Sequence, residues 1–320
     1  MSQPPARGRA LFALLLLRCI VVAGPWLAHL FVADLLLTLL LPLSVPFPTL
    51  SYDAASQVAA SVWLAVQSIF THVNGAKVTV SGTLPLQESA IVVSNHVEWA
   101  DFYLIQALAI NAGMLGRCRW FAKQQLRWIP FLGWGLWAMR MPLVSRKWTA
   151  DKKEMDRVFH GIVWMGWPTW LISYSEGTRF DAAKHGEAVT WCKAHKKPIL
   201  HHTLYPRTRG FVASVSHLRR VPRMQAVYDV TLAYAKGNKF MAAPTFWQTL
   251  SVPNLSKTWD FYVHVDRYPL DELPDTDEDL ALWLEDRWVE KDARLESLRE
   301  ALARGESWET IDSAKSSKDF

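Results

Sequence analysis

The hydrophobic pattern separates an apolar N-terminal segment from an alternating central region and an acidic C-terminal segment. The first segment covers residues 10–43 and is interrupted by two charged residues, Arg18 and Asp34, and by one histidine, His29. It is longer than the apolar core of a signal peptide and longer than the roughly 20 residues that one helix needs to cross a bilayer. Gly24-Pro25 divides it, which predicts either one kinked span or a tight hairpin that turns at this dipeptide.

The central region alternates short apolar runs with stretches of helical spacing. The apolar runs predict strands at residues 78–85, 89–96, 170–174, 197–205, 226–234 and 260–268. The helical stretches lie at residues 54–70, 101–110, 151–166 and 183–196. Because helices and strands alternate along the chain, the pattern predicts an α/β fold.

The C-terminal segment predicts one more helix. Leucine and tryptophan recur at helical spacing over residues 275–303, and Gly305 is a plausible stop. The acidic run at residues 271–279 is interpreted as a solvated turn before this helix. We therefore expect three parts: a membrane anchor at residues 1–50, an α/β domain at residues 51–270, and an acidic helix and tail at residues 271–320.

Composition narrows the class of protein. The chain has 320 residues, of which 50% are apolar and 17 are tryptophan, which excludes a disordered or low-complexity protein. Its three cysteines share no short spacing, so neither a disulfide framework nor a zinc site built on cysteine pairs is expected. Residues 184–267 carry 13 basic and 4 acidic side chains, which favours an anionic partner. The tryptophan content favours a membrane surface.

One segment combines both features. Residues 117–147 contain seven Lys or Arg, no acid and six interleaved Trp or Phe residues. This mixture is typical of an amphipathic segment that lies on an anionic bilayer. An ordinary core helix with basic edges is the alternative, and single-stranded nucleic acid is a third partner that the N-terminal apolar segment argues against.

The sharpest candidate for chemistry is the block SNHVEWAD at residues 94–101. His96 ends an apolar strand, and Asp101 follows five residues later, which is not the spacing of one helical face. The two side chains meet only if the chain turns between them and Asp101 lies in the first turn of the next helix. The carboxylate would then orient the imidazole, which could act as a general base. A strand-end histidine beside a helix-capping aspartate is the structural alternative.

Several blocks together resemble the glycerolipid acyltransferase family. Its signature combines an N-H-x4-D block with an E-G-T-R block, which are similar to SNHVEWAD and to YSEGTRF at residues 174–180. The segment at residues 123–148 is similar to the second block of the family. Residues 204–211, 227–234 and 264–274 resemble the branch of lysocardiolipin and lysophosphatidic acid acyltransferases. The resemblance covers roughly residues 75–300 and implies a central mixed sheet flanked by helices.

The resemblance also implies a role for each matching residue. His96 would deprotonate the acceptor hydroxyl, and Asp101 would orient His96. The acceptor subsite would be formed by Glu176, Gly177, Thr178 and Arg179. Lys123 and Arg146 would add positive charge, and Pro206 would lie near the acyl donor, although LYPRTRGF departs from the common form of that block. No metal and no cofactor are implied, and acyl-CoA is a co-substrate.

The expected function is the transfer of a fatty acyl group from acyl-CoA to the free hydroxyl of a lysophospholipid. Because no serine or cysteine nucleophile is evident, direct attack by the hydroxyl is expected, without a covalent intermediate. A CoA-independent transacylase, similar to tafazzin, and a catalytically silent lipid-binding membrane protein are the alternatives. The expected partners are a lysophospholipid, acyl-CoA and the bilayer, and no nucleic acid.

The charges around the apolar segment predict its orientation. Arg7 and Arg9 precede it, and no Lys or Arg lies between Arg18 and Lys77, which places the N-terminus in the cytosol. A single span would then carry His96 to the lumen, away from acyl-CoA. A hairpin at Gly24-Pro25 would instead form a wedge in one leaflet. We expect a catalytic domain that faces the cytosol, on the endoplasmic reticulum or on a mitochondrial or lipid-droplet surface.

Overall fold

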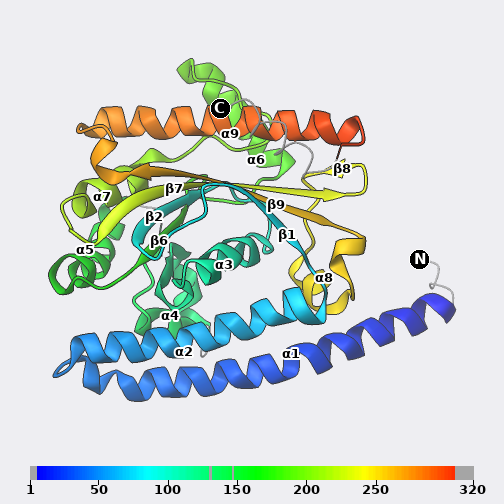
Figure 1. Ribbon diagram of the computed structural model, residues 1–320, viewed down its shortest axis with the longest axis horizontal. Coiled ribbons are helices and arrows are strands. Elements are labelled where there is room, and N and C mark those ends of the chain that lie inside the picture. The colour runs from blue at the N-terminus through cyan, green and yellow to red at the C-terminus, as the bar shows by residue number, and fades with distance from the viewer. Residues whose placement is uncertain (1–5, 130–131, 146–147, 307–320) are drawn as a thin grey trace.

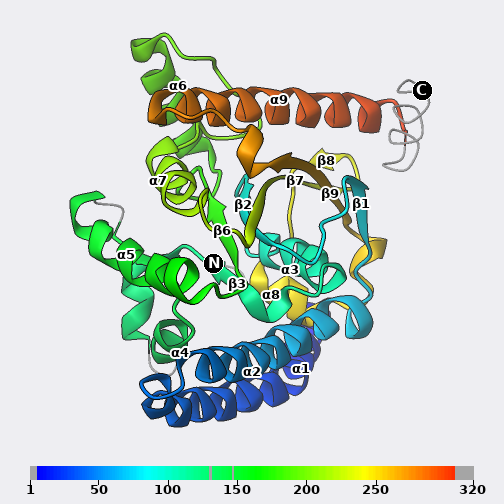
Figure 2. The same cartoon turned by 60° about the vertical axis from the view of Figure 1, so that its left-hand side comes forward.

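The computed structural model describes residues 6–129, 132–145 and 148–306, and it places one large sheet between two layers of helices (Figure 1, Figure 2). The strands run in the order β1 (Val78–Gly82), β9 (Asp260–Pro269), β7 (Met224–Lys236), β2 (Ser89–Ser94), β6 (Trp170–Tyr174) and β3 (Cys118–Trp120), and β8 (Lys239–Phe240) pairs with β7. β2 is parallel to β6 and β7, whereas β7 and β9 are antiparallel. The predicted α/β fold with a central mixed sheet is confirmed.

Helices cover both faces of the sheet. One face packs against α2 (Pro48–Ser68) and α3 (Asp101–Asn111), and the other packs against α5 (Trp148–Met165), α7 (Thr208–Leu218) and α9 (Asp277–Ala303). α6 (Ala182–His195) lies near α9, and α4 (Leu132–Ala138) and α8 (Phe246–Ser251) lie near the N-terminal helices. Because β2 is central and covered on both sides, all six of its residues are buried.

β7 shows how one strand serves both layers. Tyr228, Val230 and Leu232 point into the layer that contains α2 and α3. Val227 and Ala233 belong to the opposite layer, beneath the C-terminal helix. The period of two along a strand produces this division, and it leaves every second residue of β7 facing the side of the sheet on which α3 begins.

The N-terminal segment forms a hairpin, but it does not turn at Gly24-Pro25. α1 (Ala6–Leu40) is one helix of 35 residues with Pro25 inside it. The chain reverses after Leu40, through the short helix η1 (Pro42–Ser44), and returns as α2. The reversal lies where three prolines interrupt the chain within seven residues, Pro42, Pro46 and Pro48. A single proline removes only one backbone hydrogen bond from α1, which an otherwise apolar helix tolerates.

α2 is attached to the α/β domain along its whole length. Near its start the Tyr52 hydroxyl donates to Pro168 O at 2.8 Å, and the middle residue Ser56 accepts from Arg119 Nη2 at 3.0 Å. Beyond its end, Asn74 Nδ2 donates to Thr249 O at 2.7 Å. The domain therefore lies beside α2 rather than beyond one end of it.

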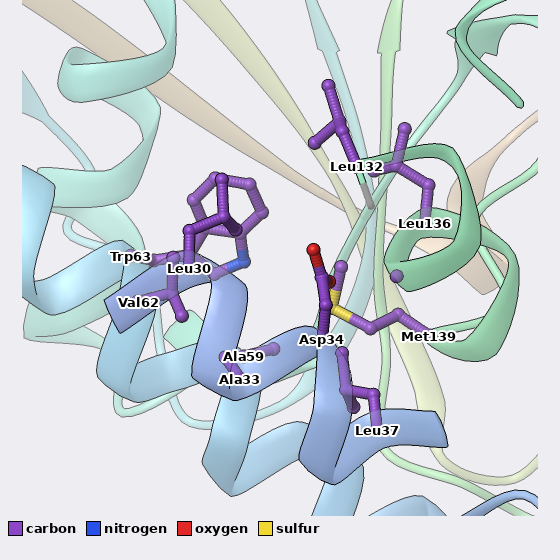
Figure 3. Close-up of a pocket in the computed structure, with 11 residues that line it drawn as sticks. Leu30, Ala33, Asp34, Leu37, Ala59, Val62, Trp63, Leu132, Leu136 and Met139 are labelled. Carbon is purple, nitrogen blue, oxygen red and sulfur yellow. The ribbon is translucent and has the colours of Figure 1, made fainter. Parts of the chain in front are cut away.

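α1 covers the outer side of α2 and exposes most of its leucines. Two of its polar residues face the protein. His29 Nε2 lies 3.0 Å from Ser61 Oγ of α2. Figure 3 shows the Asp34 carboxylate directed toward α4, into a cavity of about 20 Å³ that Leu132 and Leu136 help to line. Both helices of the hairpin are long and apolar enough to cross a membrane, by length and composition.

Two other predictions about elements are wrong. Residues 197–205 form no strand; their backbone is held by Asp292 of α9, whose carboxylate accepts from His201 N and His202 N at 2.8 and 2.7 Å. The continuous core helix considered as the alternative for residues 117–147 does not form either, whereas contact of this segment with a bilayer stays a prediction. In its described part it forms β3, β4 (Ala122–Lys123), a short helix η4 (Gln124–Trp128), α4 and β5 (Leu143–Val144). Its first apolar residues extend the sheet beside β6 instead, which buries Trp120.

The C-terminal helix matches its prediction and also reaches the core. α9 begins at Asp277, after the exposed acidic turn, and Thr276 caps it by accepting from Asp279 N. Trp288 and Lys291 are almost completely buried beneath the sheet. The Lys291 ammonium donates to Asp229 Oδ1 and to Val230 O, each at 2.7 Å. The segment therefore closes one face of the sheet, in addition to carrying acidic charge.

Candidate active site

The candidate site forms at the carboxyl ends of β2 and β6. These strands are parallel neighbours, with Ser94 opposite Tyr174, so the two sequence blocks that follow them leave the sheet at the same edge. Asn95 fixes the point at which β2 ends. Its amide donates to Leu232 O at 2.9 Å and accepts from Leu232 N at 2.8 Å, replacing the strand ladder with side-chain hydrogen bonds. The backbone at His96 is thereby free to turn away from the sheet.

The chain turns between His96 and Asp101, and their side chains meet as the sequence predicts. His96 Nδ1 lies 2.7 Å from Asp101 Oδ2, and Asp101 is the first residue of α3. The same oxygen accepts from the backbone N–H groups of Val97 and Glu98, at 2.7 and 3.2 Å, which closes the turn between the two residues. A carboxylate at this position favours a proton on Nδ1 and leaves Nε2 as the basic nitrogen.

Tyr234 completes this arrangement and was not predicted. Its buried hydroxyl donates to Asp101 Oδ1 at 2.6 Å, so both oxygens of the carboxylate are hydrogen-bonded. Burial and the adjacent Asp101 raise the pKa of Tyr234 well above its usual value, which keeps the hydroxyl protonated as a donor. The alternating pattern of residues 226–234 could have indicated Tyr234, because it places this tyrosine on the inward face near the end of the predicted strand.

Aromatic and backbone contacts hold the imidazole from the side. The Tyr174 ring stacks on the His96 ring, with the centroids 4.0 Å apart and the planes 12° from parallel. The backbone N–H of Phe180 donates to His96 O at 2.8 Å. The block YSEGTRF therefore begins and ends against His96, although 78 residues of sequence separate His96 from Tyr174.

Within this block the side chains point in different directions. Glu176 is buried; its carboxyl accepts from Trp288 Nε1 of α9 at 3.4 Å, and burial raises its pKa well above the usual value. Gly177 has a φ of +70°, and a Cβ there would lie 3.0 Å from the Arg207 side chain. Thr178 is half-buried. Glu176 thus faces the protein interior, whereas Gly177 lets an arginine approach the turn.

Arg179 projects to the surface and joins the two sequence blocks. Its Nη1 donates to Glu98 Oε1 at 2.7 Å, and its side chain is 43% exposed. An exposed ion pair of this kind contributes at most about 1 kcal/mol, so the guanidinium can exchange Glu98 for another anion at little cost. The position is therefore suited to bind a charged ligand beside His96.

The remaining predicted residues lie at different distances from this centre. Pro206 is buried in front of α7, and the next residue, Arg207, donates its backbone N–H to Ser175 O at 2.7 Å. This bond places the start of α7 against the EGTR turn.

Lys123 is exposed on β4, and no described interaction joins it to His96 or Arg179. Arg146 lies outside the described residues. Arg207 itself was not predicted; the basic run PRTR was its only signal.

Comparison with known proteins agrees with these blocks. A family model described as Acyltransferase matches residues 76–235, and one described as Acyltransferase C-terminus matches residues 255–307. The chain is 33% identical over 207 residues to the human 1-acyl-sn-glycerol-3-phosphate acyltransferase delta, an alignment that covers 65% of this chain and 52% of that protein. It is 29% identical over 245 residues to the Arabidopsis thaliana 1-acyl-sn-glycerol-3-phosphate acyltransferase 2, covering 75% of this chain and 60% of that protein. The chain thus spans little more than half the length of these relatives.

Proposed function

This chain belongs to the acyltransferase family, and from that premise we propose that it transfers a fatty acyl group from acyl-CoA to the free hydroxyl of a lysophospholipid such as lysophosphatidic acid. The observation that carries the proposal is the hydrogen-bonded series His96, Asp101 and Tyr234, which lies beside the surface arginine Arg179. A base with a fixed tautomer and an adjacent cation are the two groups that this reaction requires.

In the proposed reaction, Nε2 of His96 removes the proton of the acceptor hydroxyl as the hydroxyl oxygen attacks the thioester carbonyl. The tetrahedral intermediate collapses, the carbon–sulfur bond breaks, and the imidazolium returns the proton to the CoA sulfur. Asp101 stabilises the imidazolium while it carries the proton, and Tyr234 holds the second carboxylate oxygen. No covalent acyl-enzyme forms.

Acceptor binding is assigned to the basic groups around the EGTR turn. Arg179 binds the phosphate of the lysolipid through its planar fork in exchange for Glu98, and Arg207 approaches from the start of α7. Glu176 supports the turn from inside through α9 rather than touching the phosphate. Lys123, Arg146 and Pro206 keep the roles that the family resemblance implies, as part of this proposal.

An assay with purified protein, labelled oleoyl-CoA and a panel of lysolipids tests the function. We expect CoA release that depends on the lysolipid, and a loss of about 10²–10⁴-fold in rate for His96→Ala. The matched control is His160→Ala, which removes an exposed histidine on α5. Acyl exchange without CoA would identify a transacylase, and the absence of both reactions would identify a lipid-binding protein. Wild-type turnover by His96→Ala would contradict the proposed mechanism.

We also propose that the hairpin lies in one leaflet, with the catalytic domain on the cytosolic side of the endoplasmic reticulum membrane. α2 and the residues just after it are hydrogen-bonded to the domain at Tyr52 and at Asn74, so a spanning α2 would draw these parts of the domain into the hydrocarbon core. The exposed leucines of α1 would instead rest in the leaflet. Protease treatment of sealed microsomes tests this arrangement: a domain that is shielded until detergent is added would exclude it.

A further inference from the structure

A second basic site lies at the turn of the hairpin, apart from the sheet edge that carries His96 and Arg179. A cavity of about 120 Å³ opens between the end of α1, the start of α2 and the end of α4. Three arginines line it, Arg119 from β3, Arg140 after α4 and Arg157 from α5. Its other walls are largely apolar and include Leu37, Leu40, Pro48 and Trp137. The cavity therefore combines cationic groups with a hydrophobic surface.

The cavity lies at the opposite end of β6 from the catalytic residues. Tyr52, which lines it, donates to Pro168 O just before β6 begins, whereas Tyr174 at the end of β6 stacks on His96. None of the residues that line the cavity belongs to the two catalytic blocks. A ligand in this cavity is therefore not the acceptor at the reacting histidine.

The first of the three arginines is fixed in place by the protein. Arg119 is only 2% exposed; its Nη atoms donate to Gly116 O, Cys118 O and Ser56 Oγ. Its guanidinium lies 4.9 Å from the centroid of the Tyr52 ring, and its Nε has no partner among the described residues. Holding a buried guanidinium with no carboxylate partner among the described residues is costly, unless an anion compensates its charge.

The Arg140 guanidinium also lines the cavity and is held by an aromatic contact. It lies 5.0 Å from the centroid of the Trp167 ring and donates to none of the described residues. Burial and the nearby Arg157 lower its pKa, because both make the positive charge less favourable. The residue adopts a φ of +57°, which a non-glycine residue occupies only at some cost in backbone energy. The chain thus holds this arginine at the cavity despite unfavourable terms.

Positive charge is in excess at the cavity. Of the three arginines, only Arg157 has a described carboxylate partner, Glu154, whose oxygens lie 2.7 and 3.1 Å from its nitrogens. The neighbouring carboxylate of Asp53 is paired with Arg117 at 2.8 Å, outside the lining. Within the described part of the chain, two guanidinium groups therefore remain uncompensated, which favours an anionic ligand such as a phosphate group.

We propose that this cavity binds the phosphate of an anionic glycerophospholipid of the surrounding bilayer, with the acyl chains lying along the apolar hairpin. The position at the hairpin turn argues for a lipid over a soluble anion. Val45 and Phe47 at the turn are 85% and 56% exposed, and Trp137 at the cavity rim is 40% exposed. A basic pocket beside membrane helices is a recognised form of headgroup site. Bound lipid would attach the domain to anionic membranes.

Thermal unfolding of the detergent-purified 320-residue protein, measured with added short-chain lipids, tests this proposal. The probes are dihexanoyl phosphatidylglycerol, dihexanoyl phosphatidylcholine with the same chains, and inorganic phosphate. We expect phosphatidylglycerol to raise Tm at lower concentrations than either of the other two. Arg140→Gln should weaken its affinity about fivefold or more, the effect of one arginine at an anionic headgroup. The control Arg299→Gln, at an exposed position of α9, should leave the affinity unchanged.

Further variants test the geometry of the site and its independence from the catalytic residues. Arg140→Lys keeps the charge but loses the planar guanidinium, so it should also weaken binding. This variant replaces Arg140→Gln in the test if Arg140→Gln lowers Tm in the absence of lipid. Arg179→Ala and His96→Ala should bind phosphatidylglycerol like the wild type, so this result does not depend on the proposed reaction. Equal affinity for the two lipids, equal binding by Arg140→Gln and wild type, or equally tight binding of inorganic phosphate would overturn the proposal.

Discussion

The sheet edge that carries His96 and the N-terminal hairpin each bury an aspartate, and the two carboxylates are supported very differently. Asp101 is completely buried and accepts hydrogen bonds from His96, Tyr234 and two backbone N–H groups. Asp34 is 4% exposed among leucines, and its Oδ2 has no hydrogen-bond partner among the described residues. The first carboxylate is held in one orientation, whereas the second occupies an apolar interface.

The difference reflects what holds each region together. The catalytic edge of the sheet is built from polar side chains whose hydrogen bonds fix positions to within a fraction of an ångström. The hairpin is held by apolar packing, with a few polar anchors along α2, and such packing tolerates a wider range of side-chain positions. Equal substitutions in the two regions should therefore have unequal effects on activity and stability.

The largest effect is expected from replacing each aspartate by asparagine. Asp101→Asn removes the acceptor that selects the His96 tautomer and presents an amide to backbone N–H donors, so the rate should fall by about 10²–10⁴-fold. Asp34→Asn should leave the rate near that of the wild type. Steady-state acyl transfer at saturating acyl-CoA measures both. Similar losses in the two variants would contradict the comparison.

Two tyrosines of the site form the next pair. Tyr234→Phe leaves a buried carboxylate oxygen without its donor, so the free energy of unfolding should fall by about 1–3 kcal/mol. Tyr174→Phe removes a buried hydroxyl that has no partner among the described residues, and it should leave stability unchanged or slightly higher. Chemical denaturation in detergent compares the two. A larger loss for Tyr174→Phe would show that its hydroxyl is the one that supports the fold.

Removal of the Asp34 carboxylate from the hairpin should stabilise the folded protein. Asp34→Leu replaces the carboxyl by an apolar side chain of similar size beside the small cavity, and we expect it to raise the free energy of unfolding by about 1 kcal/mol. Asp34→Asn retains a polar group there and should gain less. Thermal unfolding of the purified proteins distinguishes these outcomes. If Asp34→Leu is less stable than wild type, the carboxylate has a function in the hairpin.

The smallest effect concerns Glu176 and appears as a pH dependence. Because burial raises its pKa above the usual 4.5, the folded protein keeps this proton after the unfolded chain has lost it. Its contribution to stability therefore falls as the pH rises above 4.5 toward the raised value. Glu176→Gln cannot ionise, so its Tm relative to wild type should increase between about pH 5 and about pH 8. A constant difference would mean that Glu176 is ionised in the folded state.

Most of the helices and strands can be located from the sequence alone. The strand at residues 170–174 coincides with β6, and the helices at residues 101–110 and 275–303 match α3 and α9 to within two residues. Strong local patterns of this kind need no tertiary information, because burial on one or two faces is encoded in the spacing. The strand predicted at residues 197–205 does not form, because the hydrogen-bond partner of its backbone comes from a distant part of the chain. Leu200 and Leu204 are buried, but the backbone bonds to Asp292, which lies about ninety residues further along the chain.

The sequence by itself determined the chemistry that lies within one turn or one block. His96 and Asp101 are five residues apart, and their meeting requires only a turn at the end of a strand. The tertiary structure decided every partner supplied from elsewhere in the chain. Tyr234 reaches Asp101 across 133 residues, Glu176 turns inward because α9 lies beneath it, and three arginines converge at a hairpin whose turn lies 16 residues beyond Pro25, at Leu41. Local spacing encodes which residues can be neighbours along the chain, whereas long-range packing alone determines which distant residues become neighbours in space.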